Sequence, residues 1–146
     1  MKTFSESIKN LDLANQYSEP YDKVIEKGIL TLFVECFDNS CIIMRTILEN
    51  QGYGTSKLEF PKWIIDASVN LGLIKEEKLW FELLSSKISI SSSGNYSTEL
   101  AKKIIRRIKN KYIRLFKELE DEINENWLDD IDMTTIETIQ YRGLIE

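Results

Sequence analysis

The apolar residues between Pro20 and Gly52 recur at three- and four-residue steps, and this spacing constrains the fold of the chain most strongly. It predicts one long helix over 21–51, because residues three and four positions apart share one face of an α-helix. Further apolar residues widen the stripe, which favours a central helix in contact with several neighbours. Gly52 and Gly54 are expected to end it. The stripe consists of Ile25, Ile29, Phe33, Cys36, Phe37, Met44, Ile47 and Leu48.

Four more segments carry a helical pattern, and together they predict an all-α fold. An opening helix over 4–18 ends before the first proline, and a short helix over 61–72 runs from the second proline to a glycine. Another short helix follows over 76–84, and a last long helix extends over 97–127, with Ser97 as its N-cap. Short connections between antiparallel neighbours make this an up-down helical bundle of four to five helices.

The length of 146 residues suits one hydrophobic core. We expect a single helical-bundle domain over 1–127 and a C-terminal tail over 128–146 that is a short helix or extended. Apolar residues make up 42% of the chain and charged residues 29%, which is typical of a soluble globular protein. Neither a signal peptide nor an apolar run of about 18 residues occurs, so we expect no membrane association. Cys36 and Cys41 are interpreted as buried free thiols, which suits a cytoplasmic protein.

The chain has no histidine, which limits its chemistry. Imidazole is not available as a general base, a proton shuttle or a metal ligand, and we expect neither a metal nor a cofactor. A serine nucleophile would need Lys87 as its base, and no other residue supports such a site. The net charge of −5 argues against a protein that coats nucleic acid by bulk charge.

A serine-rich stretch, SSKISISSSGNYSTELAKKI over 85–104, interrupts the helical pattern. One interpretation is a solvated connection between two helices. The other is an anion site, because serine hydroxyls and a turn at Gly94 and Asn95 lead into a helix N-terminus with free N–H groups. No glycine-rich phosphate motif accompanies it.

The last helix is positively charged over its first two-thirds and negatively charged at its end, the reverse of what the helix dipole favours. Lys103, Arg107, Arg114 and Lys117 are predicted to form one basic ridge. The ridge is either a solvated face with ion-pair partners elsewhere or a docking surface for phosphate or an acidic partner.

Aromatic residues near the helix ends also allow two interpretations. They are core or dimer-interface anchors, or they are platforms for stacking on a nucleobase. These residues are Trp63, Trp80, Phe81 and Tyr96.

Three motifs in order suggest a family. The first motif is a glycine in an aromatic-rich helix that ends in "L…QG". The second is a helix with the pattern "sP…vi..A...glI", and the third is a "w..ml" segment. Over roughly residues 8–125 this order resembles the nucleotidyltransferase substrate-binding proteins of the HEPN superfamily of helical bundles. The matching residues are Gly28, Phe33, Glu35, Leu48, Gln51, Gly52, Pro61, Ile64, Ala67, Gly72, Leu73, Ile74, Trp80, Leu83 and Leu84.

The resemblance implies an active loop before the final helix, built from an Arg, four to six residues, a His and a Tyr one residue beyond. In active HEPN proteins this motif supports RNA cleavage across a dimer, and the partner nucleotidyltransferase can modify the Tyr. Here Lys87 stands at the Arg position, Ser91–Ser93 replace the His, and Tyr96 is displaced by two residues. A lysine holds phosphate as a point charge, and nothing replaces the histidine.

The resemblance therefore predicts a binding protein rather than an efficient enzyme. It would form a homodimer, partner a small MNT-type nucleotidyltransferase in a toxin–antitoxin pair, and bind nucleotide or RNA phosphate. The alternatives are a HEPN ribonuclease toxin with an altered active loop and a purely structural helical dimer. The candidate phosphate-binding residues are Lys87, Ser91, Ser92, Ser93, Asn95, Tyr96, Lys103 and Arg107.

Overall fold

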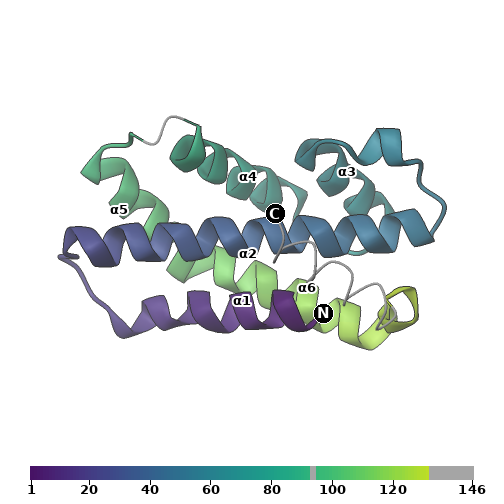
Figure 1. Cartoon of the computed structure of the whole chain (residues 1–146), viewed down its shortest axis with the longest axis horizontal. Coiled ribbons are helices and arrows are strands. Elements are labelled where there is room, and N and C mark those ends of the chain that lie inside the picture. Colours follow the sequence, from purple (N-terminus) through teal and green to yellow (C-terminus); the bar gives the residue numbers. More distant parts are fainter. Residues whose placement is uncertain (93–94, 132–146) are drawn as a thin grey trace, which may run out of the picture.

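The computed structural model describes residues 1–92 and 95–131, and throughout this part of the chain the regular structure is helical (Figure 1). The prediction of an all-α bundle is confirmed. A π-helical segment, Ile108–Tyr112, joins the last two α-helices into one continuous rod. The α-helices are α1 (Lys2–Asp12), α2 (Lys23–Asn50), α3 (Pro61–Leu71), α4 (Glu77–Ser91), α5 (Thr98–Arg107) and α6 (Ile113–Asn126).

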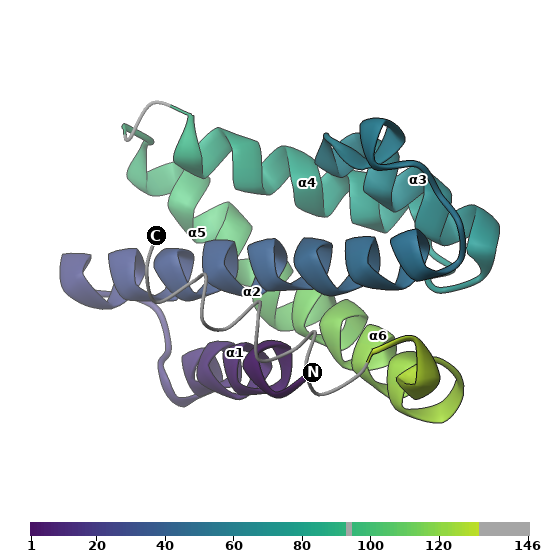
Figure 2. The ribbon, with the colours of Figure 1, turned by 45° about the vertical axis from the view of Figure 1, so that its right-hand side comes forward.

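The long helix α2 lies in the middle of the bundle, as its wide apolar stripe predicts. It contacts α1, α3, α4 and α5, and successive long helices run in opposite directions (Figures 1 and 2). α1 also packs against α6. The core between these helices is rich in aromatic side chains, and its largest fully buried members are Trp80, Tyr112, Phe4, Phe33, Phe37 and Phe116.

Local rules account for where most helices begin and end. The side chains of Asp22 and Ser97 each accept the backbone N–H three residues further on, at 2.9 and 3.0 Å, and so cap α2 and α5. Gly52 and Gly72 follow α2 and α3 with φ angles of +96° and +86°, a left-handed conformation that favours glycine. Gly54 has an ordinary φ of −70°, so only the first of the two predicted glycines ends α2.

The helix predicted over 76–84 is longer than expected, because α4 continues to Ser91. Its buried residues show why: Trp80, Leu83, Ser86 and Ile90 recur at three- and four-residue steps and keep one face against the core. Most of the stretch that we expected to break the helical pattern is therefore helix, and the break itself is short.

The opening helix is shorter than predicted. α1 ends at Asp12, and a 3₁₀ turn over Leu13–Gln16 carries the chain on toward α2. Another 3₁₀ turn, Thr55–Leu58, precedes α3, and a third, Leu128–Asp130, follows α6. Residues 132–146 lie outside the described residues, and most of the predicted tail falls there.

Cys36 and Cys41 are free thiols buried in the core, as predicted. None of the helices in residues 1–92 and 95–131 combines the length and the apolar character needed to span a membrane.

Candidate functional site

A shallow groove of about 350 Å³ lies between the outer face of α2 and the C-terminal end of α4. Tyr96, from the connection between α4 and α5, completes its wall. Apolar side chains together with a few charged and hydroxyl groups are typical of small-molecule sites. The lining residues are Lys27, Leu30, Thr31, Val34, Glu35, Ile90, Ser91 and Tyr96.

The structure brings three of the candidate residues to this groove or beside it. Ser91 and Tyr96 line it, and Lys87 lies one helical turn before Ser91 on α4. The Lys87 ammonium lies 3.6 Å from Asp38 Oδ1 and 5.9 Å from the centre of the Phe37 ring. Asp38 therefore balances much of the charge that Lys87 offers to a ligand.

The serine run does not form the predicted cradle of hydroxyls. Ser91 is the last residue of α4, and its hydroxyl donates to the Lys87 carbonyl at 2.8 Å. Ser92 is exposed and is not among the groove residues, while Ser93 falls outside the described part of the chain. Asn95 is exposed at the approach to α5. Of the described serines in the run, only Ser91 belongs to the groove.

Three polar residues of the groove were missed from the sequence: Lys27, Thr31 and Glu35 on α2. They lie four residues apart in succession, so they share one exposed face of the helix. That spacing was available as a signal. It was obscured because apolar residues on the other faces of α2 dominate the pattern.

Tyr96 is an ionisable residue of the groove whose pKa is shifted by its surroundings. Burial raises the pKa of its phenol, and the negative charge of nearby Glu26 raises it further. Glu26 itself is only 3% exposed, and its Oε1 accepts no hydrogen bond within the described residues. Both causes act in the same direction, so the Tyr96 phenol keeps its proton at neutral pH and has an O–H available to donate.

Arg107 lies elsewhere, in a polar cluster between α4 and the π-helical segment. Its NH1 donates to Ser86 Oγ at 3.3 Å, and its Nε lies 3.8 Å from Glu82 Oε1. The Tyr112 hydroxyl contacts both Ser86 and Glu82 at 2.9 Å, and the Lys111 ammonium lies 3.7 Å from Glu82. We call these five residues the Glu82 cluster. Burial is the main reason why the pKa of Tyr112 rises to about 12.

The basic ridge predicted on the last helix is divided among different partners. Arg114 contacts Glu76 at 2.8 Å, whereas Lys117 lies 3.4 Å from Asp12 on α1. Lys103 is exposed and forms no ion pair with any residue that the structure describes. The stripe is not continuous because the π-helical segment shifts the later residues around the helix axis.

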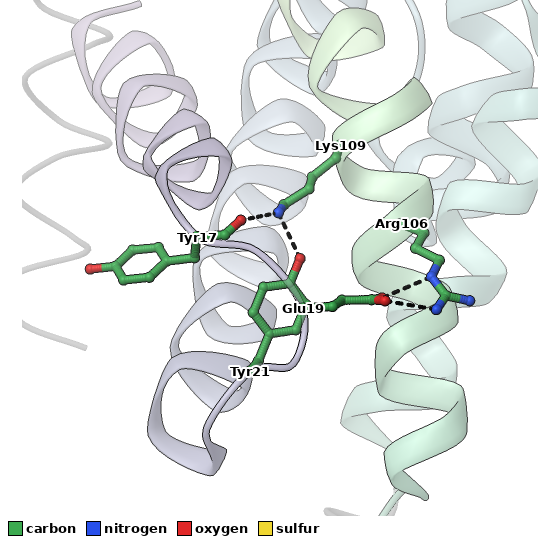
Figure 3. A network of polar contacts seen from close by, with 5 residues as sticks. All are labelled: Tyr17, Glu19, Tyr21, Arg106 and Lys109. Carbon is green, nitrogen blue, oxygen red and sulfur yellow. Dashed lines mark hydrogen bonds and ion pairs between the residues drawn. The ribbon is translucent and has the colours of Figure 1, made fainter.

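Two further cations of this helix fasten the connection between α1 and α2 (Figure 3). The Arg106 guanidinium donates two hydrogen bonds of 2.8 Å to the carboxylate of Glu19. The Lys109 ammonium donates to the Tyr17 carbonyl and the Tyr21 hydroxyl, at 2.5 and 2.6 Å. The hydrogen bond from Arg106 holds the pKa of Glu19 below its usual value. These two cations are engaged within the chain.

The aromatic residues divide between core and surface. Trp80 is 1% exposed and packs edge-on against Phe116, which confirms that it is a core residue. Trp63 is 47% exposed and forms an edge-on pair with Phe60. Within the described residues no group of three or more potential ligands is placed to hold a metal ion.

The fold and the groove define an all-helical bundle with a shallow groove of mixed apolar and polar lining at one side of its central helix. A family model described as "nucleotidyltransferase substrate binding protein like" matches residues 1–125, and the chain belongs to this family. No curated protein matches the chain.

Proposed function

We propose that the protein is the binding partner of a small nucleotidyltransferase and that the groove between α2 and α4 holds a nucleotide phosphate. The observation that carries the first part is the family match, which extends over residues 1–125. The groove supports the second part, because Lys27 and Lys87 place two cations at or beside a wall that also carries the hydroxyls of Thr31, Ser91 and Tyr96.

Binding fits the groove better than cleavage of RNA. The chain has no histidine, and the phenol of Tyr96, whose pKa is raised further above its ordinary value by burial, is a poor general base at neutral pH. The Ser91 hydroxyl donates its proton in a hydrogen bond to the Lys87 carbonyl and does not point it toward a base. The ribonuclease alternative from the HEPN resemblance has no further residue in its favour, so we propose a protein without efficient catalysis.

Co-purification tests the partnership. The tagged protein is expressed together with a small nucleotidyltransferase from the same genome, and the expected result is a stoichiometric complex on size-exclusion chromatography. Failure of that protein to co-purify at any salt concentration would count against the proposal. If the pair is a toxin–antitoxin system, expression of one member alone arrests growth and expression of both restores it.

A titration with nucleotide tests the groove. We expect Lys27→Gln and Lys87→Gln to weaken binding of ATP by about fivefold each, while Lys57→Gln, an equal change at an exposed lysine on the Thr55–Leu58 turn, leaves it unaltered. Equal affinities of all three variants and the parent protein would contradict the assignment of the groove.

We also propose that the protein is a homodimer. Ile88 supports an interface beside the groove, because it is 51% exposed on α4 and lies one turn from Ser91. An Ile88→Asp variant is expected to shift the mass measured by light scattering from twice that of the chain to that of one chain. A parent protein that is monomeric at all concentrations would refute the dimer.

A further inference from the structure

The Glu82 cluster contains three donors that converge on one carboxylate oxygen. The Tyr112 hydroxyl donates to Glu82 Oε1 at 2.9 Å, whereas Arg107 Nε and Lys111 Nζ lie 3.8 and 3.7 Å from the same atom. The last two distances exceed those of normal hydrogen bonds. Both cations are therefore attracted to Glu82 by charge but donate no hydrogen bond to its carboxylate.

The proton directions in the cluster follow from the inventory of donors. Because Tyr112 has one hydroxyl proton and gives it to Glu82, its contact with Ser86 must be donated by Ser86. Ser86 Oγ in turn accepts from Arg107 NH1. The hydroxyl proton of Ser86 therefore goes to Tyr112, and that of Tyr112 goes to Glu82. These hydrogen bonds hold the Glu82 carboxylate from its buried side. Among the described residues, Glu82 Oε2 accepts no hydrogen bond.

Charge and exposure make the cluster accessible to a ligand. The side chains of Arg107, Lys111 and Glu82 are 35%, 45% and 34% exposed. Two cations share one carboxylate, so the cluster has a surplus positive charge, and Lys103 adds another one turn before Arg107 on α5. A phosphate group has more negative charge than a carboxylate and accepts several charge-assisted hydrogen bonds at once.

We propose that Arg107 and Lys111 form a binding site for the phosphate group of a small ligand and that Glu82 is its intramolecular counter-ion. In the free protein Glu82 keeps the two cations in place, and a phosphate bound above it receives their spare N–H donors. This site is separate from the groove, because none of the five residues of the Glu82 cluster lines the groove.

Titration with inorganic pyrophosphate at low ionic strength tests the proposal, with binding followed through the backbone amide signals of α4 and the π-helical segment. Glu82→Gln removes the competing charge and keeps an acceptor for Tyr112, so we expect affinity to rise about threefold to fivefold. Glu77→Gln is the matched control, since it makes the same change at an exposed carboxylate of α4.

The opposite substitutions complete the test. Lys111→Gln and Arg107→Gln are expected to lower the affinity about fivefold, while Lys78→Gln on α4 leaves it unaltered. Equal binding by Glu82→Gln and Glu77→Gln, or by Lys111→Gln and Lys78→Gln, would overturn the proposal and leave the cluster a purely structural link. Because Lys111 donates no hydrogen bond to another described residue, its variant should fold normally, and thermal melting of every variant checks this.

Discussion

The two thiols of α2 show how strongly the core controls single residues. Cys36 is fully buried and Cys41 is 8% exposed. Burial raises the pKa of each thiol to about 12, far above the ordinary value of a cysteine. Since the thiolate is the reactive form, neither residue is a nucleophile at neutral pH.

This chemistry gives a prediction for alkylation. In the native protein at pH 8, iodoacetamide should leave both cysteines unmodified over hours, whereas in urea both should react within minutes. Mass spectrometry of the intact chain measures the added groups. Rapid modification of the native protein at either Cys36 or Cys41 would show that the core opens far more often than its packing implies.

A second prediction concerns the cap of α5. Ser97→Ala removes the acceptor for the Leu100 amide and should lower the free energy of unfolding by about 1 kcal/mol. Ser92→Ala is the control, because Ser92 is exposed at the end of α4. Urea unfolding followed by circular dichroism gives both values, and equal stabilities would mean that the cap contributes nothing.

Local signals of this kind could be predicted from the sequence. Ser97, Pro61 and Gly72 act through their own backbone conformation or a hydrogen bond to a neighbour, so the residue type is enough to place a helix end. Gly54 resembles such a signal but has an ordinary backbone conformation.

At the scale of elements, α4 shows where sequence reasoning failed. The serines from Ser85 onward made the segment look like a loop, because serine favours turns and caps over helix interiors. The structure keeps it helical because Ser86 and Ile90 are buried, and Ser89 and Ser91 bond to carbonyls four residues back. Packing against other helices therefore keeps this segment of α4 helical. The residues that it packs against, such as Tyr112, lie far away in the sequence.

The π-helical segment gives the third prediction. Tyr112 stacks on Phe33 with ring centres 5.6 Å apart, and its hydroxyl serves Ser86 and Glu82. Tyr112→Phe keeps the ring but removes the hydroxyl, so Ser86 and Glu82 each lose a hydrogen-bond partner. The free energy of unfolding should therefore fall by about 1–3 kcal/mol. Chemical denaturation measures this.

The matched control for this change is Tyr17→Phe, which removes a hydroxyl from a side chain that is 43% exposed. A double-mutant cycle with Ser86→Ala should show positive coupling between Tyr112 and Ser86. If Tyr112→Phe costs no more than Tyr17→Phe, the hydroxyl network does not hold the segment in place.

At the scale of the whole molecule, the bundle followed from the apolar periodicity, but the electrostatic surface did not. Arg114 and Lys117 appeared to belong to one ridge because only their own helix was visible in the sequence. Arg114 pairs with Glu118 on its own helix, but its other partner, Glu76, and the Lys117 partner, Asp12, come from other elements. The groove was only partly predictable for the same reason, since it needs α2 and α4 side by side.

The fourth prediction concerns stability at alkaline pH. Cys36, Cys41 and Tyr112 keep their protons in the folded protein up to a pKa of about 12, while unfolded thiols lose them near pH 9. Above pH 9 the folded state therefore binds more protons than the unfolded state, and its stability falls as pH rises. The two thiols together should cost about 3 kcal/mol by pH 10.

Urea unfolding at pH 8, 9 and 10 measures this loss. A variant with both Cys36→Ala and Cys41→Ala should be less stable at pH 8 because of lost packing, but its stability should depend much less on pH. Identical pH dependence of the two proteins would show that the thiols do not control alkaline unfolding. Tyr112 adds its own contribution only above about pH 10.

The division of the tryptophans between core and surface provides the molecule with built-in optical reporters. Trp80 is enclosed by the core, Trp63 is about half exposed on α3, and Trp127 is partly buried with its indole N–H donating to Glu122. Fluorescence from Trp80 should be blue-shifted and resist quenching by acrylamide, whereas Trp63 should emit at longer wavelength and be quenched readily. Variants that keep one tryptophan at a time would thus separate unfolding of the core from events at the surface of α3.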